Sequence, residues 1–264
     1  MGLFKQSCGK ILSQLVLVAL CILPFQSHAV ILDWDSVNWS SGNLTGSFDI
    51  DSSNPGNDIT ITISGATGYL AQDVNDVTDL TGGYNSPAQQ ALFMNMNYDS
   101  RNSTLIVTVT FNYAQGVQDV SFSLFDVDRS NAGSDSGYTD KIVLLGKNLN
   151  NTLVAPTTIT TSSDNAKTGT GTNVYVYGTD GASDTSSSGN VGYGFTGTNT
   201  INSFTFTYGN ENSGSYAAPN NPGNQWISLF DITYTPRPKV PEWHPGLIAS
   251  FACMMMAGAR RVFF

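Results

Sequence analysis

Cysteine and histidine are missing from the whole middle of this chain. The 264 residues include three cysteines and two histidines, and none of them lies between residues 30 and 239. Cysteine–histidine nucleophilic catalysis, a serine triad that uses histidine and an ordinary zinc site all need these side chains. The sequence therefore excludes these three kinds of site from residues 30–239, and it predicts a body without disulfides.

Basic residues and glutamate are also scarce there. Residues 30–239 contain 19 of the 20 acidic residues and 7 of the 11 basic ones, which leaves a net formal charge of −12. This charge argues against nucleic acid as a partner, because phosphate backbones bind basic surfaces. All of these acids except Glu211 are aspartate, the shorter carboxylate, which suits turns and calcium ligation.

The first 29 residues have the three parts of a secretory signal peptide. Lys5 and Lys10 precede an apolar run at residues 11–25, and small residues follow it at the positions that a signal peptidase requires. We expect signal peptidase to cleave between Ala29 and Val30. A retained membrane helix is the alternative, but the apolar run is short for one.

Residues 30–235 contain many short strand patterns separated by turn residues, with no persuasive helical periodicity. The expected strands are residues 30–39, 44–50, 59–64, 90–98, 104–113, 120–124, 141–145, 153–161, 173–177, 192–195, 201–208 and 226–234, with a long surface loop at 65–87. This pattern predicts an all-β fold, a single antiparallel β-sandwich of the jelly-roll kind.

The main candidate site lies on the strand pattern at residues 120–124. Asp126 and Asp128 continue the alternation of Phe122 and Leu124, so both carboxylates are expected to face the core where the strand ends. Carboxylates that face inward need a counter-charge, because burying a bare charge is costly.

A second apolar run, at residues 141–145, is expected to form a neighbouring strand. The loop between the two runs is rich in Ser, Asn, Gly and Asp, and it would return Asp135 and Asp140 to the first pair. A calcium ion would satisfy these carboxylates, because calcium accepts six to eight oxygen ligands. A salt bridge to Arg129 or Lys141 is the alternative.

The last 29 residues, 236–264, differ in chemistry from the body. A proline-stiffened linker leads into Val240-Pro241-Glu242, an apolar segment follows at 247–259, and Arg260-Arg261 comes after it. Thirteen residues fall short of the roughly 20 that span a bilayer comfortably, so the segment is a marginal anchor. Basic residues beyond it would stay cytoplasmic, which places the body on the outside.

This arrangement resembles the PEP-CTERM sorting tail of exported bacterial proteins, which a membrane exosortase recognises. Val240, Pro241 and Glu242 match the start of the tail, and Arg260 and Arg261 match its basic cluster. A tryptophan stands where the second proline is expected, and three residues follow the arginines. The resemblance implies a protein anchored at first in the inner membrane and then found at the cell surface or outside the cell.

The body is similar to a β-sandwich set found in exported surface proteins. The similarity rests on the segments LDWD (32–35), VSFSLFDVDRS (120–130), YTDKIVLLG (138–146) and WISLFDITY (226–234). It implies that the first strand lies beside the last and that aspartates surround a structural cation. Asp231 shares the parity of Ile227 and Leu229, and Asp35 ends the first of these segments. The expected calcium ligands are therefore Asp126, Asp128, Asp140, Asp231 and Asp35.

The sequence favours a non-enzymatic cell-surface or extracellular-matrix protein, with signal peptidase and an exosortase-like enzyme as partners. A carbohydrate-binding module for envelope or extracellular polysaccharide is the alternative, and it would need aromatic residues exposed on one sheet face. Trp34 and Trp39 are expected to pack in the core instead. An aspartate-dependent glycoside hydrolase is the third hypothesis, because such hydrolysis needs two carboxylates at a suitable separation.

Overall fold

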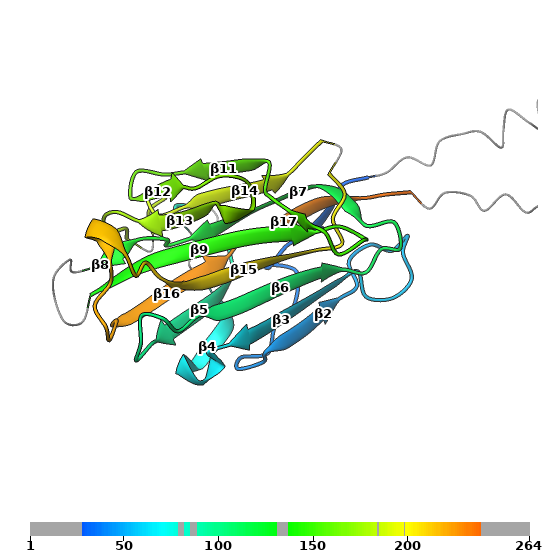
Figure 1. The fold of residues 1–264 in the computed structure, drawn as a ribbon. Helices are drawn as coiled ribbons and strands as arrows, with labels where there is room; N and C mark the ends of the chain where they lie inside the picture. Colours follow the sequence, from blue (N-terminus) through cyan, green and yellow to red (C-terminus); the bar gives the residue numbers. More distant parts are fainter. Residues whose placement is uncertain are drawn as a thin grey trace, which may run out of the picture.

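The computed structural model describes residues 28–78, 82–84, 89–130, 137–183, 185–197 and 199–238. Within these ranges the chain forms strands joined by turns and three short 3-10 helices (Figure 1). The strands are β1 (Val30–Leu32), β2 (Thr45–Phe48), β3 (Ile59–Gly65), β4 (Leu70–Thr78), β5 (Ala91–Asn97), β6 (Leu105–Phe111), β7 (Val117–Phe125), β8 (Arg129–Ser130), β9 (Tyr138–Lys147), β10 (Leu153–Val154), β11 (Thr158–Thr161), β12 (Asn165–Thr168), β13 (Tyr175–Gly178), β14 (Val191–Phe195), β15 (Ser203–Asn210), β16 (Asn224–Leu229) and β17 (Ile232–Pro236). The 3-10 helices are η1 (Thr67–Tyr69), η2 (Gly171–Asn173) and η3 (Gly214–Tyr216).

The strands build two antiparallel sheets, which confirms the predicted all-β class. In the first sheet β7 is central. On one side it pairs with β14, which in turn pairs with β11. On the other side it pairs with β17, which is followed by β1, and with β16, which is followed by β5 and β4. The second sheet has the order β12-β13-β9-β15-β6-β3-β2, with β8 and β10 added along β9.

The two sheets enclose one hydrophobic core. Phe122 of the first sheet stacks on Phe204 of the second with ring centroids 4.3 Å apart, and Phe111 meets Tyr234 at 4.9 Å. Trp34 and Trp39 are both buried and pack edge-to-face at 6.3 Å, which confirms their expected core role. Burying each large side chain stabilises the fold by about 1.5–3 kcal/mol.

The prediction of a surface loop at residues 65–87 was wrong. It contains β4, which pairs with β5 at the edge of the first sheet. Edge strands tolerate polar and charged residues because one side has no partner strand. The aspartates of this segment therefore obscured the strand pattern.

Three other expected strands were too long. The run at 153–161 is divided between β10 of the second sheet and β11 of the first. The run at 226–234 is divided between β16, which pairs with β5, and β17, which pairs with β1. The first strand ends at Leu32, because Asp33 holds a turn in which its carbonyl accepts the N–H of Ser36 and its carboxylate accepts the N–H of Asp35. Side-chain hydrogen bonds of this kind compete with a β-ladder.

The runs at 120–124 and 141–145 were expected to form neighbouring strands, but they do not pair. They belong to β7 and β9, which lie in different sheets. The short strand β8 pairs with the start of β9, so the chain passes from the first sheet to the second just after β7.

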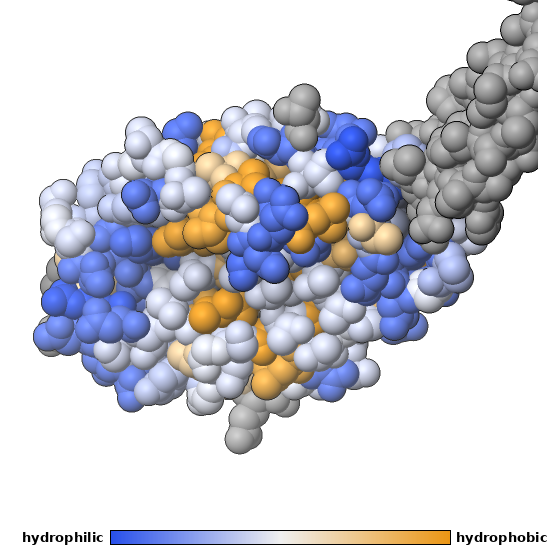
Figure 2. All heavy atoms as spheres, turned by 45° about the vertical axis from the view of Figure 1, so that its right-hand side comes forward, coloured by the Kyte–Doolittle hydropathy of each residue, from blue (hydrophilic) through white to orange (hydrophobic). Residues whose placement is uncertain are grey.

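The described chain enters and leaves the sandwich at the same end. Val30 of β1 pairs with Tyr234 of β17 in antiparallel register, as the resemblance to surface-protein sandwiches implied. We call this the near end; β7 ends and β9 begins at the opposite, far end (Figure 1). With the right-hand side of that view turned forward, Figure 2 shows hydrophobic residues in patches interrupted by hydrophilic ones. Within the described ranges no helix is long and apolar enough to cross a membrane.

Candidate functional site

Three of the predicted ligands meet at the far end and are buried. Asp126 and Asp128 follow β7, Asp140 lies in β9, and their exposed fractions are 5%, 3% and 0%. The N–H of Asp140 donates to the carbonyl of Asp128 at 2.9 Å, and the N–H of Asp128 donates to Oδ2 of Asp140 at 3.2 Å. We call these three residues the far-end acid cluster.

The local sequence explains how β7 ends at this cluster. Asp126 has a φ of +64°, in the left-handed region that aspartate adopts more readily than most residues. This conformation ends the strand after Phe125. The N–H of Val127 then bonds to the carbonyl of Gly189, so a different segment of chain takes over the backbone hydrogen bonding.

The environment of the cluster disfavours the ionised form of the Asp140 carboxyl group. Burial and the neighbouring carboxylate of Asp128 raise the pKa of Asp140 well above its usual value, and Asp126 adds to the effect. Hydrogen bonds to Asp140 from the N–H of Asp128 and from the hydroxyl of Tyr208, at 3.0 Å, act in the opposite direction. Asp140 therefore needs either a proton or a nearby cation.

The aromatic residue Tyr138 is part of the same environment. Burial and then the charge of Asp140 raise the pKa of Tyr138, whose hydroxyl also hydrogen-bonds with Asp128. Oδ2 of Asp128 accepts the N–H of Ala182 at 2.7 Å. Neutral donors from three different segments thus converge on the cluster.

The two cations considered as salt-bridge partners contact other groups. Lys141 Nζ lies 3.2 Å from Oε2 of Glu211 and 4.1 Å from the ring centroid of Tyr175. The guanidinium of Arg129 lies over the ring of Tyr216, at 5.1 Å from its centroid. Lys141 and Arg129 thus each make a contact with a residue outside the cluster.

The calcium site itself stays a prediction. Within the described residues, no three aspartate, glutamate, histidine or cysteine side chains are placed so that together they could hold a metal ion. The far-end acid cluster supplies the oxygen chemistry that calcium prefers, but not such a set. Asp135, which the loop was expected to bring to this place, lies outside the described residues.

The other two predicted ligands, Asp231 and Asp35, lie near each other: Asp231 lines the outer face of the first sheet, and Asp35 is exposed in the turn after β1. Asp231 lies in the break between β16 and β17, and its Oδ1 accepts the N–H of Trp34 at 3.1 Å. Burial raises the pKa of Asp231 to about 6, with the charges of Asp33 and then Asp35 adding to the effect. The strand break shifts the alternation, so Asp231 does not continue the inward row that its parity predicted.

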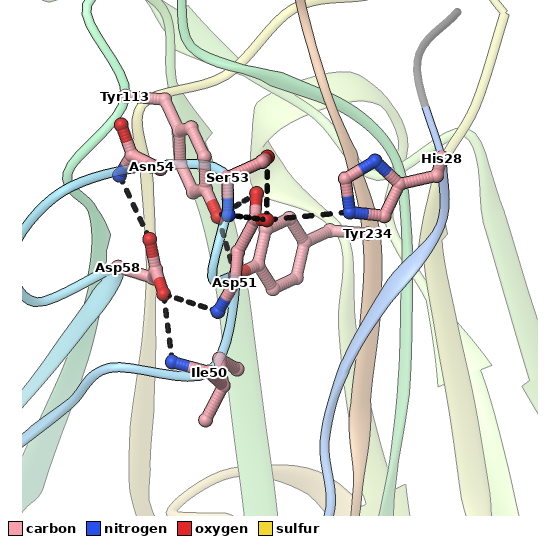
Figure 3. A network of polar contacts seen from close by, with 8 residues as sticks. All are labelled: His28, Ile50, Asp51, Ser53, Asn54, Asp58, Tyr113 and Tyr234. Carbon is pink, nitrogen blue, oxygen red and sulfur yellow. Dashed lines mark hydrogen bonds and ion pairs between the residues drawn. The ribbon is translucent and has the colours of Figure 1, made fainter.

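The near end holds an acid network that the sequence did not reveal (Figure 3). Asp58 is fully buried; its Oδ2 accepts the N–H groups of Ile50 at 2.7 Å and Asp51 at 2.6 Å, and its Oδ1 accepts Nδ2 of Asn54 at 2.7 Å. Every donor comes from the turn that joins β2 to β3. The one available signal was an aspartate that directly precedes the β3 pattern.

Asp51 extends this network to His28, before β1, and to Tyr113, after β6. Its Oδ1 accepts the N–H and hydroxyl of Ser53 and lies 3.3 Å from Nε2 of His28, and its Oδ2 accepts the hydroxyl of Tyr113 at 3.1 Å. Burial alone would raise the pKa of Asp51, but the hydrogen bonds from Ser53 and Tyr113 and the charge of His28 lower it overall. We call Asp51, Asp58 and these partners the near-end acid network.

The remaining predicted site residues concern processing. At the expected cleavage point Ala29 is exposed, whereas Val30 is buried and belongs to β1. The sorting residues Val240, Pro241, Glu242, Arg260 and Arg261 lie outside the described residues.

Comparison with known proteins gives no relative from which a function could be transferred. No family model matches the chain, and no curated protein is significantly similar to it in sequence.

Proposed function

We propose that this chain is an exported, non-enzymatic protein of the cell surface or extracellular matrix, sorted through its C-terminal tail. The observation that carries the proposal is the pairing of β1 with β17. The expected signal peptide and the expected anchor segment both join the sandwich at its near end. A body attached at one end leaves its far end directed away from the membrane.

The burial of the acidic residues supports a structural role over a hydrolytic one. Hydrolysis by two carboxylates needs a cleft in which both reach the sugar. Each member of the far-end acid cluster is at most 5% exposed, and the near-end carboxylates are held by hydrogen bonds from their own turn.

The finer points of the proposal follow from the sequence. The sandwich is of the jelly-roll kind, residues 1–29 are a signal peptide, and residues 236–264 are a linker and sorting tail read by an exosortase-like enzyme in the inner membrane. Calcium at the far-end acid cluster belongs to the same proposal. Because Val30 is buried within β1, signal peptidase must cut before β1 pairs with β17.

The tail is tested by deletion of residues 241–264 in a host that sorts the full chain. Release of the body as a soluble secreted protein is the expected result. A truncated protein that stays as strongly associated with the envelope as the full chain would show that the tail is not the sorting signal.

The leader is tested by N-terminal sequencing of the exported protein. We expect the sequence to begin at Val30. Exported protein that still carries residues before Ser27 would contradict the signal peptide.

Binding of extracellular polysaccharide is the second candidate function. Trp34 and Trp39 cannot provide an exposed platform, because both are buried. Tyr84, however, is 50% exposed beside the outer face of the first sheet, and it is the observation that favours this candidate.

A further inference from the structure

The outer face of the first sheet carries an open groove of about 380 Å³, which we call the outer-face groove. Hydroxyl side chains from three strands line it: Ser121 and Ser123 of β7, Thr158 and Thr160 of β11, and Thr233 of β17. Strand alternation explains this, because the residues between them point into the core. The lining is therefore rich in groups that both donate and accept hydrogen bonds.

A glycine creates the space between these strands. Gly192 of β14 stands in register with Ser123 on one side and Thr160 on the other. A Cβ added at Gly192 would lie 3.7 Å from Cβ of Thr160 and 4.0 Å from Oγ of Ser123, which is ordinary contact. The strand would tolerate a side chain at this position, but the side chain would fill the groove.

An aromatic pair forms one wall. The ring of Tyr84 stacks on Phe230 with centroids 5.2 Å apart and an angle of 11°, and half of its surface remains exposed. Tyr84 is held in place through Gly82, whose carbonyl accepts Nδ2 of Asn190 at 2.8 Å. Gly82 has a φ of +48°, and a Cβ there would lie 2.5 Å from the ring of Phe125, so glycine is required for this close approach.

The charges along the groove narrow the class of ligand. Among the described residues that line the groove, Asp231 is the one with a carboxyl group, and none is Lys, Arg or His. Without a cation the groove does not suit phosphate, sulfate or uronate groups, and the body as a whole carries excess negative charge. A single carboxylate also does not provide the pair that glycoside hydrolysis needs.

We propose that the outer-face groove binds a neutral glycan. The exposed surface of Tyr84 packs against the apolar face of a pyranose ring, while Asp231 and the serine and threonine hydroxyls exchange hydrogen bonds with the sugar hydroxyls. This inference develops the second candidate function and does not depend on the sorting tail. It assigns the body a ligand and names the residues that contact it.

Affinity electrophoresis of the purified full chain tests the inference. The gels contain dextran, mannan, galactan or hydroxyethylcellulose as neutral polymers, and polygalacturonate as an acidic one. We expect at least one neutral polymer to retard the chain and polygalacturonate to leave its mobility unchanged. Absence of retardation by every neutral polymer, or retardation by polygalacturonate alone, would overturn the proposal.

Two variants connect the binding to the groove. Gly192→Val, which fills the groove, should abolish retardation, and Tyr84→Ala should weaken binding about three- to tenfold, in line with the loss of one aromatic contact. Leu153→Ala is the matched control, because Leu153 is 49% exposed on the edge strand β10 of the other sheet and should bind like the parent. Equal retardation of parent, Tyr84→Ala and Gly192→Val would place any binding elsewhere and refute the site.

The design separates this inference from the sorting proposal. The binding assay uses purified protein, so a failure of tail-dependent sorting in cells does not change its result. If Gly192→Val does not fold, Tyr84→Ala still decides the question, because it removes a half-exposed ring from outside the core.

Discussion

The two ends of the sandwich both bury aspartates, but in opposite electrostatic environments. At the near end, the carboxylates of Asp51 and Asp58 each accept three or more contacts from N–H, amide, hydroxyl or imidazole groups. At the far end, Asp126 and Asp128 lie close enough to Asp140 for their charges to raise its pKa, and the hydrogen bonds to Asp140 from the N–H of Asp128 and the hydroxyl of Tyr208 do not outweigh this. At Asp51 the hydrogen bonds and the charge of His28 outweigh burial, whereas at Asp140 burial and the neighbouring carboxylates outweigh the hydrogen bonds, so the balance of these effects decides which form of a buried carboxyl is stable.

The two ends should consequently respond to pH in opposite directions. The pKa of Asp51 is lowered in the folded protein, so its contribution to stability is present above the unfolded pKa and is lost as the pH falls. The pKa of Asp140 is raised, so its contribution is present below the unfolded pKa, about 3.9, and is lost as the pH rises through the folded value. A low pH should therefore reduce the contribution of the near end to stability, and a high pH should reduce that of the far end.

The largest effect is expected from Asp58→Ala at the near end. The change leaves the N–H groups of Ile50 and Asp51 and the amide of Asn54 without their acceptor. We expect the free energy of unfolding of the full chain to fall by about 3–5 kcal/mol in urea denaturation. Asp58→Asn keeps one acceptor oxygen and should cost less; equal losses in the two variants would mean that the cost comes from packing.

The next largest effect is expected from calcium binding at the far end. If the far-end acid cluster takes up calcium, a hundredfold excess over the dissociation constant should stabilise the chain by about 2.7 kcal/mol, which a thermal melt detects. Asp126→Ala combined with Asp128→Ala should abolish this rise. Asp33→Ala with Asp35→Ala is the control and should retain it, because Asp35 is exposed in a turn elsewhere. Equal melting temperatures in calcium and in chelator would exclude the site.

Asp140→Asn examines the same cluster in the absence of metal. Removing a carboxyl whose pKa is raised by burial and by Asp128 should stabilise the chain at pH 8 by about 1–3 kcal/mol and leave it little changed at pH 4. Urea unfolding in chelator between pH 4 and pH 8 measures the difference. A variant that is less stable than the parent at pH 8 would show that a charged Asp140 has a favourable partner there.

The smallest effect is expected from His28→Ala at the near end. The imidazole is 57% exposed, and isolated exposed ion pairs contribute about 0–1 kcal/mol. Ser53 and Tyr113 still hold Asp51, so removal of residues 1–29 should likewise leave the near-end acid network intact. A loss above about 2 kcal/mol in urea unfolding would mean that His28 is essential to the network.

The fold class could be predicted from the sequence, because it follows from local periodicity, and alternation identified most strands. The expected burial of Asp126 and Asp128 is confirmed, but alternation is not its cause, because β7 ends at Phe125 and both Phe125 and Val127 are buried as well. The two tryptophans were correctly expected in the core. Strand β4 was missed because its polar residues lie at a sheet edge, where the hydrophobic pattern weakens.

Only the tertiary structure decided which residues meet. Period-two alternation gives the face of a strand but not the sheet it joins, so it could not show that β7 and β9 lie in different sheets and still bring Asp128 against Asp140. A break of two residues between β16 and β17 turned Asp231 toward the outer face, away from the far-end acid cluster. The hydrogen bonds of Asp58 are local to one turn, but the contacts of Asp51 with Tyr113 and His28 and the outer-face groove join segments that are distant in sequence, and local patterns do not indicate such contacts.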